Sequence, residues 1–179
     1  MLKTLLFILL ISCFSPISLA DTEEIVPIKS GMNNTRLAEL ISRLDSNAQG
    51  RAGLWQFKVE HITVVVVTDE RADRMRVMAR IAPAADLDEE ELRRLMQANF
   101  DSALDARYAV AQDALWSAFV HPLASLGDQA FFSGVAQTVT LAHTFGSSYS
   151  SGALVFGGGD SNSIKERELF DRIIKRGSV

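Results

Sequence analysis

Apolar and polar residues follow a two-residue period over much of the stretch from Trp55 to Ile81. Phe57 and Val59 continue an alternation that begins at Trp55, as expected for a strand with one buried face. Residues 62–67 are all β-branched, which is typical of a strand covered on both faces. A third alternation places four apolar residues on one face: Met75, Val77, Ala79 and Ile81. The stretch predicts a three-stranded meander that needs helices to cover it.

Helical periodicity lies on both sides of this meander. Apolar residues at i, i+3, i+4 and i+7 predict a first helix, capped by Asn34 or Thr35. Those residues are Leu37, Leu40, Ile41 and Leu44. After Pro83, which ends the last strand, Asp86 and Glu89 have the spacing of a capping box and predict a second helix. Its apolar face would comprise Leu92, Leu95, Met96, Phe100 and Ala103.

The second half of the chain predicts a hairpin and two more helices. Residues 107–121 form two strands about a turn at Asp113 and Ala114, and Pro122 ends the second one. A third helix is expected over residues 127–145, with an apolar side at Phe131, Phe132, Val135, Val139 and Ala142. The predicted order is α-β-β-β-α-β-β-α. The fold class is therefore α+β, an antiparallel sheet packed by helices, followed by a Gly/Ser-rich extension and a short helix.

Residues 1–20 have the features of a signal peptide. Lys3 gives a short basic region, Leu5 to Phe14 an apolar core, and residues 18–20 a small-x-small cleavage site. Export to the periplasm or the medium is expected, with cleavage after Ala20. The alternative is a lipoprotein anchored through Cys13, because residues 10–13 resemble a lipobox. Against it, Cys13 comes early, and the apolar segment that follows ends in a good peptidase site.

The remaining chain divides into four predicted segments. They are an exposed lead-in at 21–33, an α+β domain at 34–145, a Gly/Ser-rich linker at 146–163 and a helix at 164–176. Cys13 is the only cysteine, so the exported chain would have no disulfide and would depend on its core. Loss of Lys3 with the leader would change the formal net charge from −4 to −5. This acidity argues against a general nucleic-acid binder.

Three stretches give the chain a family resemblance. Residues 91–100 look like the Leu-Leu-x-Ala-Asn helix end of secretion chaperones, and the hairpin Tyr108 to Phe119 with its stop at residues 121–123 also fits. Together they resemble the type III secretion chaperone-like fold, shared by class I secretion chaperones and the YbjN family of bacterial sensory transduction regulators. The resemblance covers residues 36–145. The export signal and the C-terminal extension depart from it.

The resemblance implies binding of protein rather than catalysis. It implies homodimerisation, often through the middle helix, and partner peptides that wrap apolar patches and sheet edges. On this chain the dimer residues would be Leu92, Leu95, Met96 and Phe100. This is an analogy at the level of the fold.

Candidate chemical sites are few. The three histidines, His61, His121 and His143, lack the i, i+4 and HExxH spacings used for zinc. The serines of 146–152 do not form a nucleophile elbow, and the glycines of 157–159 lack the lysine of a P-loop. The acids of 86–91 are explained by a helix N-terminus. We therefore expect no catalytic, cofactor or metal site.

Two surface features leave alternatives open. Arg74, Arg76 and Arg80 fall on one face by their two-residue period. That face is either a solvated one that also protects an edge strand, or a surface for an acidic peptide or anionic lipid. The apolar residues of 154–156 and 169–174 either fold back on the sheet, dock on a partner or lie on a membrane surface. Mixed charges on the last helix disfavour the membrane, so membrane contact is not expected unless Cys13 is lipidated.

The function expected from these observations is that of an exported, non-catalytic protein-binding module, chaperone-like or regulatory. The main alternative is a periplasmic small-ligand-sensing domain, with a pocket lined by Trp55 and Trp116. A hydrolase is the least favoured alternative.

Overall fold

A computed structural model describes residues 31–152 and 164–178, and its centre is a six-stranded antiparallel sheet. The strands stand in the order β1-β2-β3-β4-β6-β5. Their bounds are β1 (Gln49–Arg51), β2 (Leu54–Val59), β3 (Ile62–Asp69), β4 (Arg74–Pro83), β5 (Arg107–Ala111) and β6 (Ala114–His121). The predicted α+β class is confirmed. Strand β1 was not predicted, because its three residues are all exposed and carry no apolar alternation.

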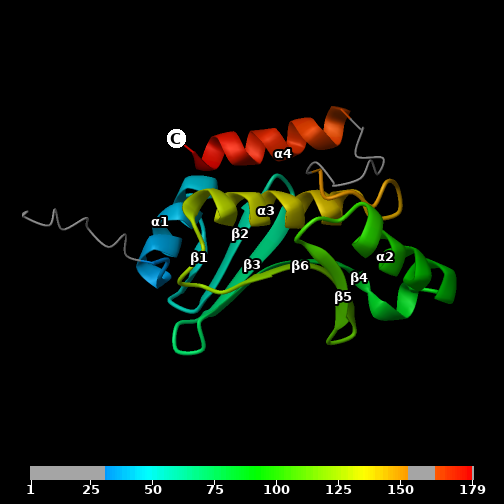
Figure 1. Cartoon of the computed structure of the whole chain (residues 1–179), viewed down its shortest axis with the longest axis horizontal. Coiled ribbons are helices and arrows are strands. Elements are labelled where there is room, and N and C mark those ends of the chain that lie inside the picture. Colours follow the sequence, from blue (N-terminus) through cyan, green and yellow to red (C-terminus); the bar gives the residue numbers. More distant parts are fainter. Residues whose placement is uncertain (1–30, 153–163, 179) are drawn as a thin grey trace, which may run out of the picture.

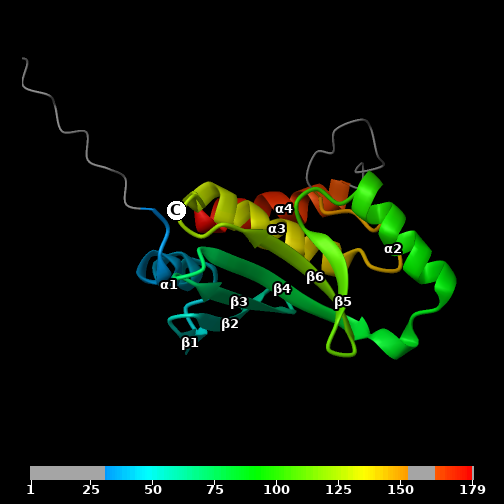
Figure 2. The ribbon, with the colours of Figure 1, turned by 60° about the horizontal axis from the view of Figure 1, so that its bottom comes forward.

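The helices lie on one side of this sheet and at one end of it. Their bounds are α1 (Asn34–Leu44), the 3₁₀ turn η1 (Ala84–Asp86), α2 (Glu89–Asp101), α3 (Asp128–His143) and α4 (Ile164–Gly177). Figures 1 and 2 show α1 and α3 against the sheet and α4 outside α3, while α2 stands at the end of the sheet beside β5. In the described part of the chain, no helix lies on the opposite face of the sheet. None of the described helices is long and apolar enough to span a bilayer.

The core lies between the sheet and α3. Residues paired across four neighbouring strands form a row that is at most 7% exposed: Trp55, Val66, Val77 and Phe119. The Phe119 ring packs against Gly134 of α3 so closely that a Cβ there would lie 2.6 Å from it. This contact fixes the depth at which α3 sits on the sheet.

Helix α3 is buried on more sides than its predicted apolar side. Ten residues between Phe131 and Leu141 are buried. The reason is α4, which covers the outer side of α3 through the buried residues Leu169 and Ile173. Gly177 brings the end of α4 against the Phe132 ring, which leaves no room for an added Cβ. The last helix thus folds back onto another helix, not onto the sheet.

The helix starts differ slightly from the prediction. Helix α1 is capped by Asn33, whose side chain accepts from the Arg36 N–H at 2.9 Å, not by Asn34 or Thr35. The capping box of α2 is Asp88 with Glu91, not Asp86 with Glu89. The two pairs have the same spacing. The 3₁₀ turn that follows Pro83 uses Asp86 and delays the helix.

The segment after α3 belongs to the packed body as far as it is described. Ser150 and Ser151 are fully buried, and the Thr144 hydroxyl donates to the Ser150 carbonyl at 2.8 Å. Residues 146–152 therefore pack against the domain, although the sequence predicted the start of a linker. The apolar residues 154–156 and the glycines 157–159 lie outside the described residues.

Candidate functional site

The outer face of α2 exposes apolar side chains that the fold does not bury. Leu92, Met96 and Phe100 are 39%, 58% and 88% exposed. Their spacing of four residues puts them in one stripe along the helix, which we call the α2 stripe. Leu95, the fourth residue predicted for this surface, is only 1% exposed and packs in the core. The predicted set thus divides into one structural residue and three exposed ones.

Side-chain hydrogen bonds fix α2 in place. The Asn99 amide donates to the Tyr108 carbonyl at 3.1 Å, and its oxygen accepts the Tyr108 N–H at 2.7 Å. Asn99 therefore occupies part of the free edge of β5, much as a neighbouring strand would. The Ser102 hydroxyl donates to the Tyr149 carbonyl at 2.7 Å, and Arg94 lies 4.7 Å from the Tyr149 ring centre. The α2 stripe is presented by a helix anchored to the sheet edge and to the segment after α3.

Sequence patterns identified Asn99 only as part of a family-like helix end. Its partner Tyr108 lies on another element, and an amide that pairs with a strand edge has no periodic signal. The Asn99 role was therefore missed. The nearest sequence signal is that Asn99 is a polar residue beside the apolar face of a predicted helix.

The three predicted arginines do share one face of the sheet. Arg74, Arg76 and Arg80 are exposed on β4, while Met75, Val77 and Ala79 between them are buried under the helices. No described helix covers this face, and β4 lies between β3 and β6, so the arginines do not protect an edge strand. Within the described chain, no carboxylate lies within ion-pair distance of these three guanidinium groups.

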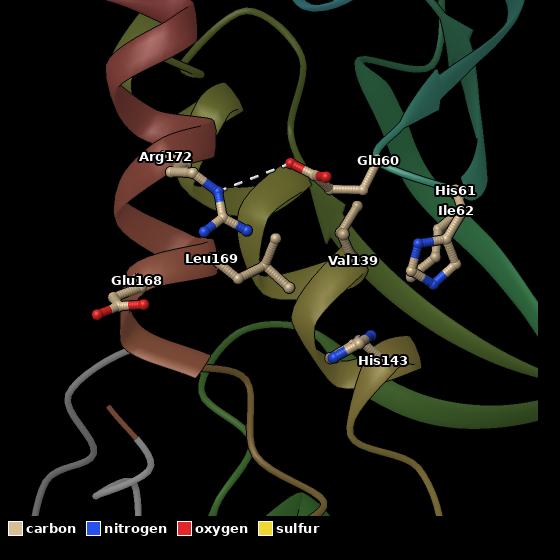
Figure 3. Close-up of a pocket in the computed structure, with 8 residues that line it drawn as sticks. All are labelled: Glu60, His61, Ile62, Val139, His143, Glu168, Leu169 and Arg172. Atoms are coloured by element: carbon tan, nitrogen blue, oxygen red, sulfur yellow. Dashed lines mark ion pairs between the residues drawn. The ribbon is translucent and has the colours of Figure 1, made fainter. Parts of the chain in front are cut away.

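The structure brings together two histidines that are distant in sequence. His61 follows β2, His143 ends α3, and their ring centres are 5.8 Å apart. They line a pocket of about 350 Å³ between α3, α4 and the β2–β3 turn. Figure 3 shows Arg172 of α4 directed toward Glu60 of the turn, and their charged atoms are 3.8 Å apart. Leu169 and Val139 supply the apolar wall.

Neither sequence spacing nor composition could have found this pair of histidines, because tertiary packing creates it. In the described residues, no group of three or more His, Cys, Asp or Glu side chains is placed to hold a metal ion. The third histidine, His121, stacks on Phe119, and its Nδ1 lies 2.7 Å from the Pro122 carbonyl. It is not part of the pocket.

The two tryptophans do not line one pocket. Trp55 is 7% exposed on the helix-covered face of the sheet. Trp116 lies on the opposite face beside Arg80, and its indole N–H donates to the Ala111 carbonyl at 2.9 Å. The prediction that both tryptophans line one ligand pocket is therefore wrong, because the alternation of strand residues places them on opposite faces of the sheet.

Perturbed charges occur away from these surfaces and stabilise the fold. Hydrogen bonds from the backbone N–H groups of Lys58 and Asn47 hold the pKa of the Asp45 carboxyl below its ordinary value. Hydrogen bonds to Asp128 and then to Glu39 raise the pKa of the Arg36 guanidinium. The Arg36–Asp128 pair joins the starts of α1 and α3. Both pKa shifts come from hydrogen bonds that hold the fold together.

Comparisons with known proteins give a likeness of fold. No protein-family model matches this sequence, and no curated protein matches it. Among solved structures, the chain is similar to one from the crystal structure of the ExsC–ExsE complex. The sequence identity is 14%, the TM-score is 0.47, and the match covers 62% of this chain and 92% of that chain. A likeness of this strength concerns fold alone and carries no argument about partners or activity.

Proposed function

We propose that this chain is a non-catalytic protein-binding module that associates first with a second copy of itself through the α2 stripe. The observation that carries the proposal is the exposure of Phe100, at 88%, together with Met96, at 58%. Burial of large apolar side chains in a contact stabilises the complex by about 25 cal/mol for each Å² of apolar surface removed from water. An aromatic residue and a methionine on one helix face are typical of protein contact surfaces.

The setting of the α2 stripe favours a specific contact. Helix α2 is held by Asn99 and Ser102, so association would not require the helix to become ordered. The neighbouring strand β5 exposes Val110 at 53%, which adds apolar area at the same end of the molecule. A two-fold pair would place the same stripe on both partners.

Light scattering on residues 21–179 tests self-association. We expect a mass twice that of the monomer, and a monomer mass for Met96→Asp, because a carboxylate would be desolvated in the contact. Gln97→Asp adds the same charge to the next, exposed position outside the stripe and should remain a dimer. Leu95 is unsuitable for this test because it is buried. A monomer mass for the unchanged protein at every concentration would reject the proposal.

We also propose that the module acts after export. The support is the pattern of residues 1–20, a basic start, an apolar core and a small-x-small site. Mass spectrometry of the protein from an expressing bacterium tests it. A chain that begins at Asp21 in the periplasm supports export, and an acylated chain that begins at Cys13 indicates the lipoprotein form. An intact leader on cytosolic protein contradicts both.

A small-ligand function is the second candidate, and the pocket of Figure 3 favours it. The pocket offers two imidazoles and a guanidinium beside Leu169 and Val139, together with the carboxylates of Glu60 and Glu168, which suits a small zwitterionic carboxylate with an apolar end. Thermal shifts across a panel of short-chain carboxylates would test it, with His143→Ala as the variant that should lose the shift. No shift with any member would remove this candidate.

A further inference from the structure

The uncovered face of the sheet combines apolar and cationic side chains in one row. Leu54, Val67, Arg76 and Val120 are paired in turn across β2, β3, β4 and β6. The three apolar members are 46%, 36% and 55% exposed. Since neighbouring strands lie about 4.8 Å apart, the Arg76 side chain rises between two exposed valines. We call this face, with Arg74 and Arg80 beside the row, the open face.

Within the described residues, the three arginines of the open face have no counterion. Arg74, Arg76 and Arg80 form no ion pair in the described chain, although it contains several carboxylates close to β4. Asp69, the cross-strand neighbour of Arg74, accepts instead from the backbone N–H groups of Arg71 and Ala72. A shallow pocket of about 260 Å³ is lined by Val67, Arg74, Arg76 and Met78, and by Asp69 opposite Arg74. The surface thus offers unpaired guanidiniums next to an apolar depression.

We propose that the open face binds an acidic segment of a partner protein, in which carboxylates alternate with apolar side chains. This inference rests on the proposed protein-binding function and names the chemical class of the partner. A carboxylate over Arg76 would form charge-assisted hydrogen bonds. Its apolar neighbours would cover Val67 and Val120 and remove them from water. One segment would therefore satisfy both kinds of side chain in the row.

The charges disfavour a second copy on the open face. Two open faces packed against each other would bring arginines against arginines, and like charges in contact oppose association. Self-association through the α2 stripe leaves the open face free, because α2 stands at the end of the sheet (Figure 2).

A membrane surface fits less well than a protein segment. Asp69, the last residue of β3, and Glu70 and Asp73 of the β3–β4 turn lie at one end of the face. A flat anionic bilayer would press its headgroups against these acids, whereas a peptide segment can end before the turn. An acidic peptide therefore matches the charge distribution along the strands.

Fluorescence anisotropy with labelled twelve-residue peptides tests the inference. The probe alternates glutamate with valine or leucine. One control peptide has lysine for glutamate, and another has serine for the apolar residues. The protein variants are Arg76→Gln with Arg80→Gln, and Arg93→Gln on α2 as the loss of one exposed charge outside the open face. Thermal unfolding of each variant checks that it is folded.

We expect the acidic apolar peptide to bind the unchanged protein more tightly than either control peptide, and binding to weaken with salt. The double variant should lose roughly fivefold in affinity, since two exposed charge contacts are removed, and Arg93→Gln should lose nothing. Equal binding of the lysine peptide, no binding of the acidic one, or binding only to anionic vesicles would overturn the inference. Met96→Asp should bind the peptide normally, so failure of the dimer proposal is seen separately.

Discussion

The two faces of one sheet differ although they are built from the same strands. Phe119 is 4% exposed and its neighbour Val120 is 55% exposed, while Val66 and Val67 differ in the same way, at 0% and 36%. Helices α1 and α3 cover one face, and no described helix covers the other (Figures 1 and 2). Apolar residues on the covered face stabilise the fold. Those on the open face contribute little to it and remain available to a partner.

The largest predicted contrast is between two adjacent residues of β6. Phe119→Ala should lower the free energy of unfolding by about 3–5 kcal/mol, because it leaves a cavity under Gly134. Val120→Ala should change it by less than about 0.5 kcal/mol, because more than half of Val120 is already exposed to water. Urea unfolding of both variants measures the difference. Equal losses of unfolding free energy in the two variants would show that the open face stabilises the fold as much as the covered face does.

A smaller effect tests how closely α3 sits on the covered face. Gly134→Ala would favour the helix by about 1 kcal/mol in isolation. Here the new Cβ would meet the Phe119 ring at 2.6 Å, so we expect a net loss of about 1–2 kcal/mol from overpacking. Adding Phe119→Leu should recover part of that loss. Stabilisation by Gly134→Ala alone would contradict this account of the contact.

The two hydrogen bonds between Asn99 and the Tyr108 backbone, here called the Asn99 clamp, link the sheet edge to the α2 stripe. Asn99→Ala should cost about 1–2 kcal/mol by leaving the Tyr108 backbone groups without their partner. Amide exchange at Tyr108 should become faster and that at Phe119 should stay slow, because the damage is at the sheet edge. Gln97→Ala, an exposed change on the same helix, is the control. Unchanged exchange at Tyr108 would show that the clamp contributes nothing.

The smallest effect comes from Asp45, which accepts from the Lys58 and Asn47 N–H groups at one end of the sheet. Its folded pKa is lowered from 3.8, so its contribution to stability is present above that value and is lost as the pH falls below it. Asp45→Asn should therefore lower the melting temperature slightly near neutral pH and less at acid pH. Melting curves from pH 7 to pH 2.5 check this. A constant difference across the range would contradict it.

Periodicity predicted the helices and strands well, but it predicted poorly which of their faces are covered in the folded protein. The alternation of Trp55, Phe57 and Val59 identified a strand face, and the arginines of β4 fell on the opposite one as expected. The β-branched run of residues 62–67 predicted cover on both faces, yet Val67 is exposed, because a local run does not reveal which helices reach the sheet. The burial of Leu95 and the exposure of the α2 stripe beside it also depend on tertiary packing.

Sites formed by distant residues escaped prediction for the same reason. Asn99 meets Tyr108, and His61 meets His143, only after α2 and α3 have docked. Trp55 and Trp116 could not be assigned to one pocket or two from composition. Their positions in the strand register decide that they lie on opposite faces.

The two tryptophans allow the most direct test of the central claim that the open face is the surface left for a partner. Trp55→Phe leaves Trp116 on the open face as the reporter, and Trp116→Phe leaves Trp55 on the covered face. We predict that the acidic apolar peptide shifts the emission of Trp116 and shields it from acrylamide, while Trp55 is shielded and unchanged throughout. A response from Trp55 alone, or a Trp116 that is already shielded without peptide, would contradict the account.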